Sequence, residues 1–463
     1  MEIRNKATQI QLFSFSSPQM RAFHMSWLAF FAVFFAWFGI APLMPLVRED
    51  LGLSQAQIGN TIVASVAATV LVRVLIGPLC DRFGARLVYS ALLVVGSIPV
   101  MTIGLARSYE AFLLFRLAIG SIGAAFVVTQ YHTSMMFAPR CVGTANATTA
   151  GWGNAGGGAT QIAMPLLLAA LVSLGAAESQ AWRLAMVVPG AVLFLLGICY
   201  YLVTQDAPDG NYRELRRQER LGRPLRGGGL HSLVSAFGDR RVLALFVVYA
   251  ACFGIELTMN NVAALYFHDR FTLDLRTAGL IAGLFGLMNL FARTLGGYLS
   301  DASGARWGLS GRVWALFAIL VAEGLALLLF SQAGLLAAAI PLLILFSLCV
   351  QMAEGATFGV VPFVRPESLG AVSGIVGAGG NVGAVLAGFL FGLEWLAFED
   401  AFLVLGLAVT AASLAALAVG SGSAAETVPR PAVLGRPAPS SRRSAEEMIS
   451  TAVRQSSASL PGD

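Results

Sequence analysis

Charged residues are scarce in this sequence. Only 12% of its 463 residues are charged, whereas 57% are hydrophobic and the mean hydropathy is +0.75. A soluble globular domain carries roughly 25% charged residues, so the composition excludes a water-facing surface for most of the chain. Apolar stretches of about twenty residues, long enough to span a bilayer, recur from Met25 to Ala418. We therefore expect a membrane protein with many transmembrane helices.

The sequence also has very little lysine, and it lacks recognisable catalytic and metal-binding motifs. Lys6 is the only lysine among thirty basic residues, and the five cysteines lack metal-ligand spacing. No nucleophile–base arrangement and no phosphate-binding loop occur, so we expect no metal, no cofactor and no enzymatic activity. Residues 1–18 are polar and precede an apolar run long enough to span a membrane, which argues against a cleavable signal peptide.

Twelve spans are predicted, divided six and six by a polar segment rich in arginine. The predicted organisation is a cytoplasmic N-terminal segment (1–24), a six-helix bundle (25–205), a basic cytoplasmic linker (206–241), a second six-helix bundle (242–420) and a disordered cytoplasmic tail (421–463). The spans start near Met25, Ile58, Leu87, Phe112, Thr144, Trp182, Val242, Ala278, Val313, Leu335, Leu369 and Ala401.

Charge placement predicts the orientation. With the N-terminus in the cytoplasm, most arginines fall on the cytoplasmic side. The linker arginines are then a topology signal and lipid-headgroup contacts rather than a nucleic-acid patch. We expect a multi-pass protein of the cell inner membrane, functional as a monomer, with both termini inside. The opposite side carries only Arg48, Arg107, Arg183, Arg270 and Arg276.

One loop pattern occurs twice, at residues 77–86 and 297–306. Glycine, aspartate, glycine and arginine recur with an offset of 220 residues, which predicts a duplicated bundle related by an axis along the membrane normal. Short glycine turns permit tight helix packing, and Asp81 and Arg86 can pair or cap helix ends. The predicted gating-loop residues are Gly77, Asp81, Arg82, Gly84 and Arg86 in the first copy and Gly297, Asp301, Gly304 and Arg306 in the second.

Two arginines lie inside spans, eight residues before each loop aspartate. Arg73 and Arg293 are also 220 residues apart, and eight residues of helix rise about 12 Å, so both are expected near the bilayer midplane. Each placement costs at least roughly 2.5–3.5 kcal/mol. One interpretation is a buried ion pair with Glu256 or Glu354. The other is an anion site, because the guanidinium fork donates parallel hydrogen bonds to a planar oxyanion.

A second matched pair supports the anion site. Asn154 in span five and Asn381 in span eleven are 227 residues apart, and each lies eleven residues into its helix. An asparagine amide can donate to a third oxygen of an anion without adding charge, although interhelical hydrogen bonding is the alternative. The neighbouring glycines, which permit close backbone approach, are Gly151, Gly153, Gly379 and Gly380.

These motifs resemble known families. The G-x-x-x-D-R-x-G-x-R loop resembles the signature loop of the major facilitator superfamily, although Ala302 replaces the first arginine in the second copy. Residues 148–158 and 374–383 resemble the nitrate signatures of the nitrate/nitrite porter family, with Ala155 in place of a bulkier apolar residue. The resemblance covers about residues 21–418. It implies a twelve-helix all-α fold, cytoplasmic latch loops and a pair of substrate-binding arginines at positions 73 and 293.

The expected function is secondary active transport of nitrate, with nitrite as a second substrate. Moving an anion into a negative-inside cell costs about 2.3 kcal/mol per 100 mV, so uptake needs a coupled proton or an exchanged anion. The two membrane carboxylates favour proton-coupled uptake by alternating access, and the candidate proton-coupling residues are Glu256, Glu354 and His132. Arg116 resembles part of another general transporter motif and suggests a structural or gating role.

Three alternatives remain open at this point. The first is electroneutral exchange of nitrate for nitrite, and the second is transport of another small anion. A non-transporting receptor on the same scaffold is the third, but neither the linker nor the tail resembles a folded signalling domain. A drug exporter for bulky cations should carry acidic cavity residues rather than two arginines.

Overall fold

The computed structural model describes residues 5–138, 141–217, 234–365 and 369–420, which belong to one compact unit, Met1–Ser423. These residues are almost entirely helical, and eleven segments are long and apolar enough to cross a membrane. The predicted tail and much of the predicted linker lie outside the described residues.

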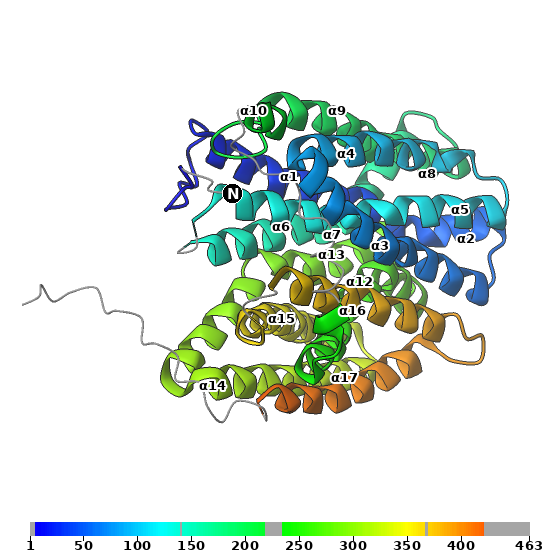
Figure 1. Cartoon of the computed structure of the whole chain (residues 1–463). Helices are drawn as coiled ribbons and strands as arrows, with labels where there is room; N and C mark the ends of the chain where they lie inside the picture. Colours follow the sequence, from blue (N-terminus) through cyan, green and yellow to red (C-terminus); the bar gives the residue numbers. More distant parts are fainter. Residues whose placement is uncertain (1–4, 139–140, 218–233, 366–368, 421–463) are drawn as a thin grey trace, which may run out of the picture. The chain divides into compact units, whose positions relative to one another are not determined.

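The first group of helices is drawn from blue to dark green in Figure 1. It comprises α1 (Pro18–Trp37), η1 (Ala41–Leu43), α2 (Met44–Leu51), α3 (Gln55–Phe83), α4 (Ala85–Thr102), η2 (Ile103–Leu105), α5 (Tyr109–Gly120), η3 (Ser121–Ala124), α6 (Ala125–Met136), α7 (Val142–Ser173), α8 (Glu178–Ala185) and α9 (Val187–Val203), followed by the short α10 (Tyr212–Arg217).

The second group is drawn from green to orange (Figure 1). It comprises α12 (Arg240–Phe271), α13 (Leu275–Leu287), η4 (Met288–Leu290), α14 (Ala292–Ser331), α15 (Leu336–Val360), η5 (Val361–Phe363), α16 (Leu369–Phe391) and α17 (Phe398–Gly420).

Local sequence sets where these helices begin. Ser54 and Gln57 form a capping box at the start of α3, in which each side chain binds the other's backbone N–H. Ser17 caps α1 directly before Pro18, and Asp274 caps α13 through two backbone N–H groups. The backbone N–H groups at these helix starts are thereby satisfied by short polar side chains.

One apolar segment is too long for a single passage. Leu275–Ser331 contains 57 residues, and a helix of that length extends about 85 Å against roughly 30 Å of hydrocarbon. Its helical dihedral angles break at Trp307 and Gly308, where the φ of Gly308 is +62°. We interpret the segment as two passages joined at this kink, so eleven long segments in the described chain accommodate the predicted twelve spans without confirming that number.

The most extensive packing between helices of the two groups is α3 against α16 and α7 against α13. At the start of α3, a Cβ on Gly59 would collide with the backbone of Gly392 just after α16, so the two backbones touch. Toward the other ends of the two helices, no described atom lies within 4 Å of a Cβ built on Gly77 or Gly374. The two backbones therefore touch at the end where α3 begins, and these two glycines make no such contact with described residues at the other end.

Candidate anion-binding site

The two arginines predicted to lie in the membrane are both buried. Arg73 on α3 is 9% exposed and Arg293 on α14 is 5% exposed. Each contacts helices of both groups, since Arg73 binds α16 and Arg293 lies beside Gly151 of α7. The charges therefore face the interface between the two groups of helices.

Arg293 has a carboxylate partner. Its Nη1 lies 2.5 Å from Oε2 of Glu354 on α15, and both side chains are buried. Its Nη2 donates to the hydroxyl of Tyr249 on α12 at 3.0 Å. The ion pair that the sequence left open as an alternative is therefore present for this arginine in this conformation.

Arg73 has no such partner. It donates to the carbonyl oxygens of Gly377 (3.2 Å) and Gly123 (3.3 Å), and among the described residues no carboxylate forms an ion pair with it. The rings of Phe126 and Phe253 lie 5.2 and 5.9 Å from its guanidinium carbon. Carbonyl dipoles and aromatic faces attract a cation but leave its full charge uncompensated.

Asn154 extends the network around Arg293. Its Nδ2 donates to Oε2 of Glu256 at 3.2 Å, and Nδ2 of Asn289 donates to Oε1 of the same carboxylate at 2.7 Å. Glu256 and Glu354, which pairs with Arg293, are both fully buried in the second group of helices. An amide that donates to a carboxylate can also donate to another oxyanion, so Asn154 is suitably placed for both predicted roles.

Asn381 belongs to the surroundings of Arg73. Its Nδ2 donates to the carbonyl oxygen of Gly377 at 3.3 Å, and that oxygen also accepts from Arg73. Its Oδ1 is buried and has no partner among the described residues. The two asparagines are thus matched in sequence but differ in contacts: Asn154 holds a carboxylate and Asn381 holds a backbone carbonyl.

The four predicted site glycines permit close helix packing. A Cβ on Gly151 would lie 3.9 Å from the side chain of Arg293, and one on Gly380 would collide with the ring of Phe253, which also faces Arg73. Gly153 is pressed against Phe30 in the same way, and Gly379 against the backbone of Phe246. Gly151 and Gly380 therefore shape the surroundings of the two arginines, whereas the other two hold helices together.

His132 is occupied elsewhere. Its Nδ1 lies 2.5 Å from the hydroxyl of Tyr200 on α9, and its Nε2 lies 2.8 Å from the carbonyl oxygen of Gln205. Both ring nitrogens are used within the first group of helices, so this conformation does not connect His132 with Glu256 or Glu354.

The first gating loop is a tight turn fixed by a residue that the sequence did not single out. Asp206 accepts from the backbone N–H of Arg86 (2.9 Å), and its carboxylate occupies the place a Cβ on Gly84 would need. Burial raises the pKa of Asp206 above its usual value. Arg86 also donates to the carbonyl oxygen of Tyr201 at 2.6 Å. Of the other predicted residues, Arg82 is exposed, Gly77 faces open space and the Asp81 side chain lies outside the described residues.

The second loop is continuous helix rather than a turn. Asp301 pairs with Arg312 at 2.5 Å, and Arg312 donates to the carbonyl oxygen of Gly359 at 3.2 Å. Gly304 packs against the Arg312 side chain. Gly297 has room around it, and Arg306 is exposed. The two copies share sequence, but of the two only the first is closed by a carboxylate from another described segment.

Several buried polar residues were missed at the sequence level. Tyr249 lies on the same face of α12 as Glu256, at a helical spacing of seven, and Asn289 precedes Arg293 by four residues. That spacing is the signal that could have found them. Glu323 on α14 is fully buried, and within the described part of the chain neither of its carboxylate oxygens has a hydrogen-bond partner.

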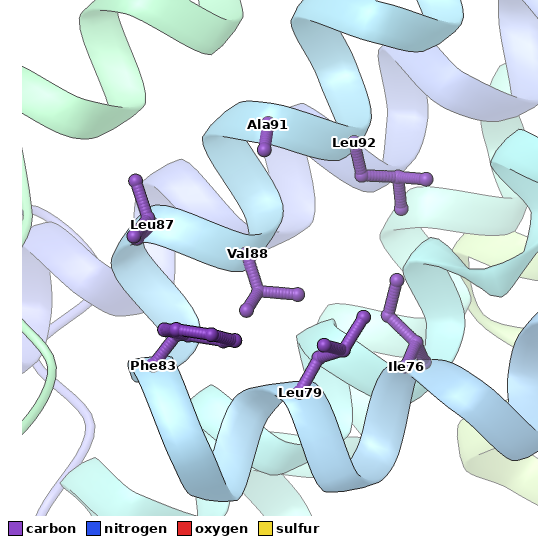
Figure 2. Close-up of a pocket in the computed structure, with 7 residues that line it drawn as sticks. All are labelled: Ile76, Leu79, Phe83, Leu87, Val88, Ala91 and Leu92. Carbon is purple, nitrogen blue, oxygen red and sulfur yellow. The ribbon is translucent and has the colours of Figure 1, made fainter.

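A groove of about 340 Å³ lies between the end of α3 and the start of α4. Figure 2 shows that its lining is apolar, with Phe83, Leu87 and Val88 among the side chains that surround it. A groove without donors cannot bind a small anion, so it is separate from the site around the arginines.

Comparison with known families gives a match over most of the chain. The model of the Major Facilitator Superfamily matches residues 26–388. A bacterial homolog of the human lysosomal transporter Spinster has the same fold, with a TM-score of 0.61, 17% sequence identity and coverage of 88% of this chain and 96% of that one. The predicted class, an all-α membrane protein of the major facilitator fold, is thereby confirmed.

Two curated relatives are more similar in sequence. High affinity nitrate transporter 2.5 of Arabidopsis thaliana is 42% identical over 398 residues, which cover 84% of this chain and 77% of the relative. The nitrate/nitrite transporter NrtP of Picosynechococcus is 31% identical, with coverage of 81% of this chain and 85% of the relative. Alignments of this extent take in most of both groups of helices.

Proposed function

Because the chain belongs to the nitrate/nitrite porter family of the major facilitator superfamily, we propose that it carries nitrate across the inner membrane by alternating access around Arg73 and Arg293. The observation that carries this proposal is the pair of buried guanidiniums at the interface of the two helix groups, one of them without a counter-charge among the described residues. Nitrate is planar with three oxygens, and a guanidinium donates two parallel hydrogen bonds to such an anion.

Glu354 supplies the coupling. In this conformation it occupies Nη1 of Arg293, one of the groups that nitrate would need. Nitrate and an ionised Glu354 therefore compete for one cation. Protonation of Glu354 releases Arg293, and nitrate replaces the lost negative charge. Binding of nitrate is thus linked to uptake of a proton within the same network.

Glu256 sets how many protons accompany each nitrate. One proton on Glu354 makes the loaded site electrically unchanged, so membrane voltage contributes nothing to uptake. A second proton on Glu256, which is also fully buried in the second group of helices, would make entry of the loaded carrier electrogenic. Each net positive charge then gains about 2.3 kcal/mol per 100 mV of inside-negative potential.

Exchange of nitrate for nitrite is the second candidate. Among the described residues, no carboxylate pairs with Arg73. An anion can therefore bind there without the protonation of a competing carboxylate. This arrangement favours a carrier that always holds one anion or another, including nitrite. Other small planar oxyanions would satisfy the same guanidinium geometry.

The orientation and domain organisation are part of the proposal. Cytoplasmic termini place the end of α3 and the start of α16 toward the cytoplasm, with two six-helix bundles at residues 25–205 and 242–420 rocking about the arginines. The carrier acts as a monomer in the bilayer, with nitrate, nitrite and protons as its partners.

Uptake of labelled nitrate into proteoliposomes tests coupling when the pH gradient and the voltage are set independently. We expect an acidic exterior to drive accumulation without internal nitrite. Glu354→Gln should abolish that accumulation and retain nitrate–nitrate exchange, since Gln leaves Arg293 free without a proton. Glu323→Gln is the matched control, because it removes a buried carboxyl of the same helix group that pairs with no arginine of the described chain. Dependence on internal nitrite and indifference to pH would leave exchange in place of symport.

A further inference from the structure

Arg116 is a third buried arginine, and the proposed function does not use it. It lies on α5 and is only 1% exposed. Its Nη2 donates to Oδ1 of Asn261 at 2.7 Å, its Nη1 donates to the carbonyl oxygen of Trp37 at 3.4 Å, and its Nε has no partner in the described residues. Among those residues, no carboxylate forms an ion pair with it. A permanent cation is therefore buried with neutral partners only.

Such a cation is costly unless an anion compensates it. Removing an ionised group from water without a counter-charge is strongly unfavourable, and an arginine cannot discharge itself by losing a proton. If Arg116 only held the closed conformation together, a hydrogen-bond donor to Asn261 would be sufficient, and an uncharged side chain would provide one. The charge itself calls for a ligand that is negative.

Arg116 lies in line with the central site. The same span continues from α5 through η3, where the carbonyl oxygen of Gly123 accepts from Arg73. Seven helical residues separate Arg116 from Gly123, a rise of about 10 Å. Asn261 belongs to α12 of the second group, so Arg116 also faces the interface between the groups.

This conformation seals Arg116 at its end of the interface. Beyond it, Arg48 of α2 binds Asp269 of α12 through two hydrogen bonds of 2.5 and 2.9 Å. Gln55 of α3 donates to the carbonyl oxygens of Leu393 and Leu396 at 3.2 and 3.1 Å. When the two groups separate at this end, Arg116 loses Asn261 and its guanidinium becomes available to an ion from outside.

We propose that Arg116 is an outer binding site for a small monovalent oxyanion. The anion binds there when the carrier is open to the outside, and it then moves on to Arg73 and Arg293. This inference rests on the proposed nitrate transport and on the proposed orientation. The site would raise the local concentration of the anion at the entrance, from which the anion would move inward to Arg73 and Arg293.

The test compares the two faces of the membrane. Intact cells present the outer face to labelled nitrate, and inverted vesicles present the cytoplasmic face. Arg116→Gln removes the charge but keeps a donor for Asn261, and we expect the KM measured in intact cells to rise about tenfold, the loss of one charge-assisted contact. The KM measured in inverted vesicles should stay within about twofold. Arg116→Lys, which keeps the charge, should lie between wild type and Arg116→Gln in intact cells.

Asn261→Ala is the matched control, because it breaks the same hydrogen bond from the other side and leaves the charge. We expect it to alter the maximal rate while leaving the outer KM near the wild-type value. An equal rise in the outer KM for Asn261→Ala and Arg116→Gln would overturn the outer site, and so would an equal change in KM at both faces. Either result would leave Arg116 with a gating role only. If the wild-type protein carries no nitrate in these cells, it is the proposed function that fails.

Discussion

Arg73 and Arg293 occupy the same position in the two halves of a repeated sequence, yet their surroundings differ. Arg293 pairs with Glu354, whereas Arg73 rests on two carbonyl oxygens and two phenyl rings. The buried glutamates Glu256, Glu323 and Glu354 all belong to the second group of helices, whereas the buried Asp206 lies after α9 of the first group. Both halves therefore carry a buried cation, and the two glutamates that we propose for proton coupling lie in the second half.

The largest effect should come from changing the shape of either cation while keeping its charge. Arg73→Lys or Arg293→Lys removes the planar fork, so nitrate binding should fall at least about a hundredfold with the fold retained. Binding is measured by isothermal titration in detergent, and folding by thermal unfolding of the same samples. Wild-type affinity in either lysine variant would contradict a clamp made by two guanidiniums.

A second effect, on stability rather than on binding, should separate the two arginines. Arg293→Gln leaves Glu354 buried without its cation, which costs about 3–5 kcal/mol of unfolding free energy. Arg73→Gln removes an unpaired cation and should cost far less. Denaturant unfolding of both variants measures the difference between their free energies of unfolding.

The double variant Arg293→Gln with Glu354→Gln sharpens this comparison, because it removes both charges and should recover most of the lost stability. Equal losses of unfolding free energy for Arg73→Gln and Arg293→Gln, with no recovery in the double variant, would show that the ion pair does not stabilise the fold.

The smallest effects should come from the asparagines. Asn154→Ala and Asn381→Ala should each weaken nitrate binding by about 1–3 kcal/mol if their amides donate to the anion. Only Asn154 holds Glu256, so only its variant should also change the pH dependence of binding. Titrations at several pH values distinguish the two. Unchanged affinity with lowered thermal stability in both variants would assign the amides to helix packing alone.

The sequence is informative about the arginines because membrane burial and internal repetition constrain them strongly. The offset of 220 residues is enough to identify Arg73 and Arg293 as a pair. It cannot decide whether Glu354 or nitrate faces Arg293, since a repeat in the sequence carries no information on the partner that α15 contributes. The ion pair is present in this conformation, and the anion site stays a prediction that the proposed protonation of Glu354 makes compatible with it.

The gating loops show where sequence reasoning stopped. The repeat identified Gly84 and Arg86 but not Asp206, which comes from a segment 120 residues away from Arg86 and holds the turn. Similarly, the second copy reads as a loop, whereas helix continues until Trp307 and Gly308. Partners contributed by distant segments leave no local pattern, so the turn could be predicted while its partner could not.

The contact between Gly59 and Gly392 has a thermodynamic consequence. Glycine has no side-chain rotamers, so bringing these two backbones together orders no side chain and separating them releases none. This contact therefore carries little side-chain entropy in either direction, unlike the neighbouring hydrogen bonds of Gln55 to Leu393 and Leu396, which order a long side chain. Through the glycine contact itself, temperature should shift the balance between the touching and the separated backbones only weakly.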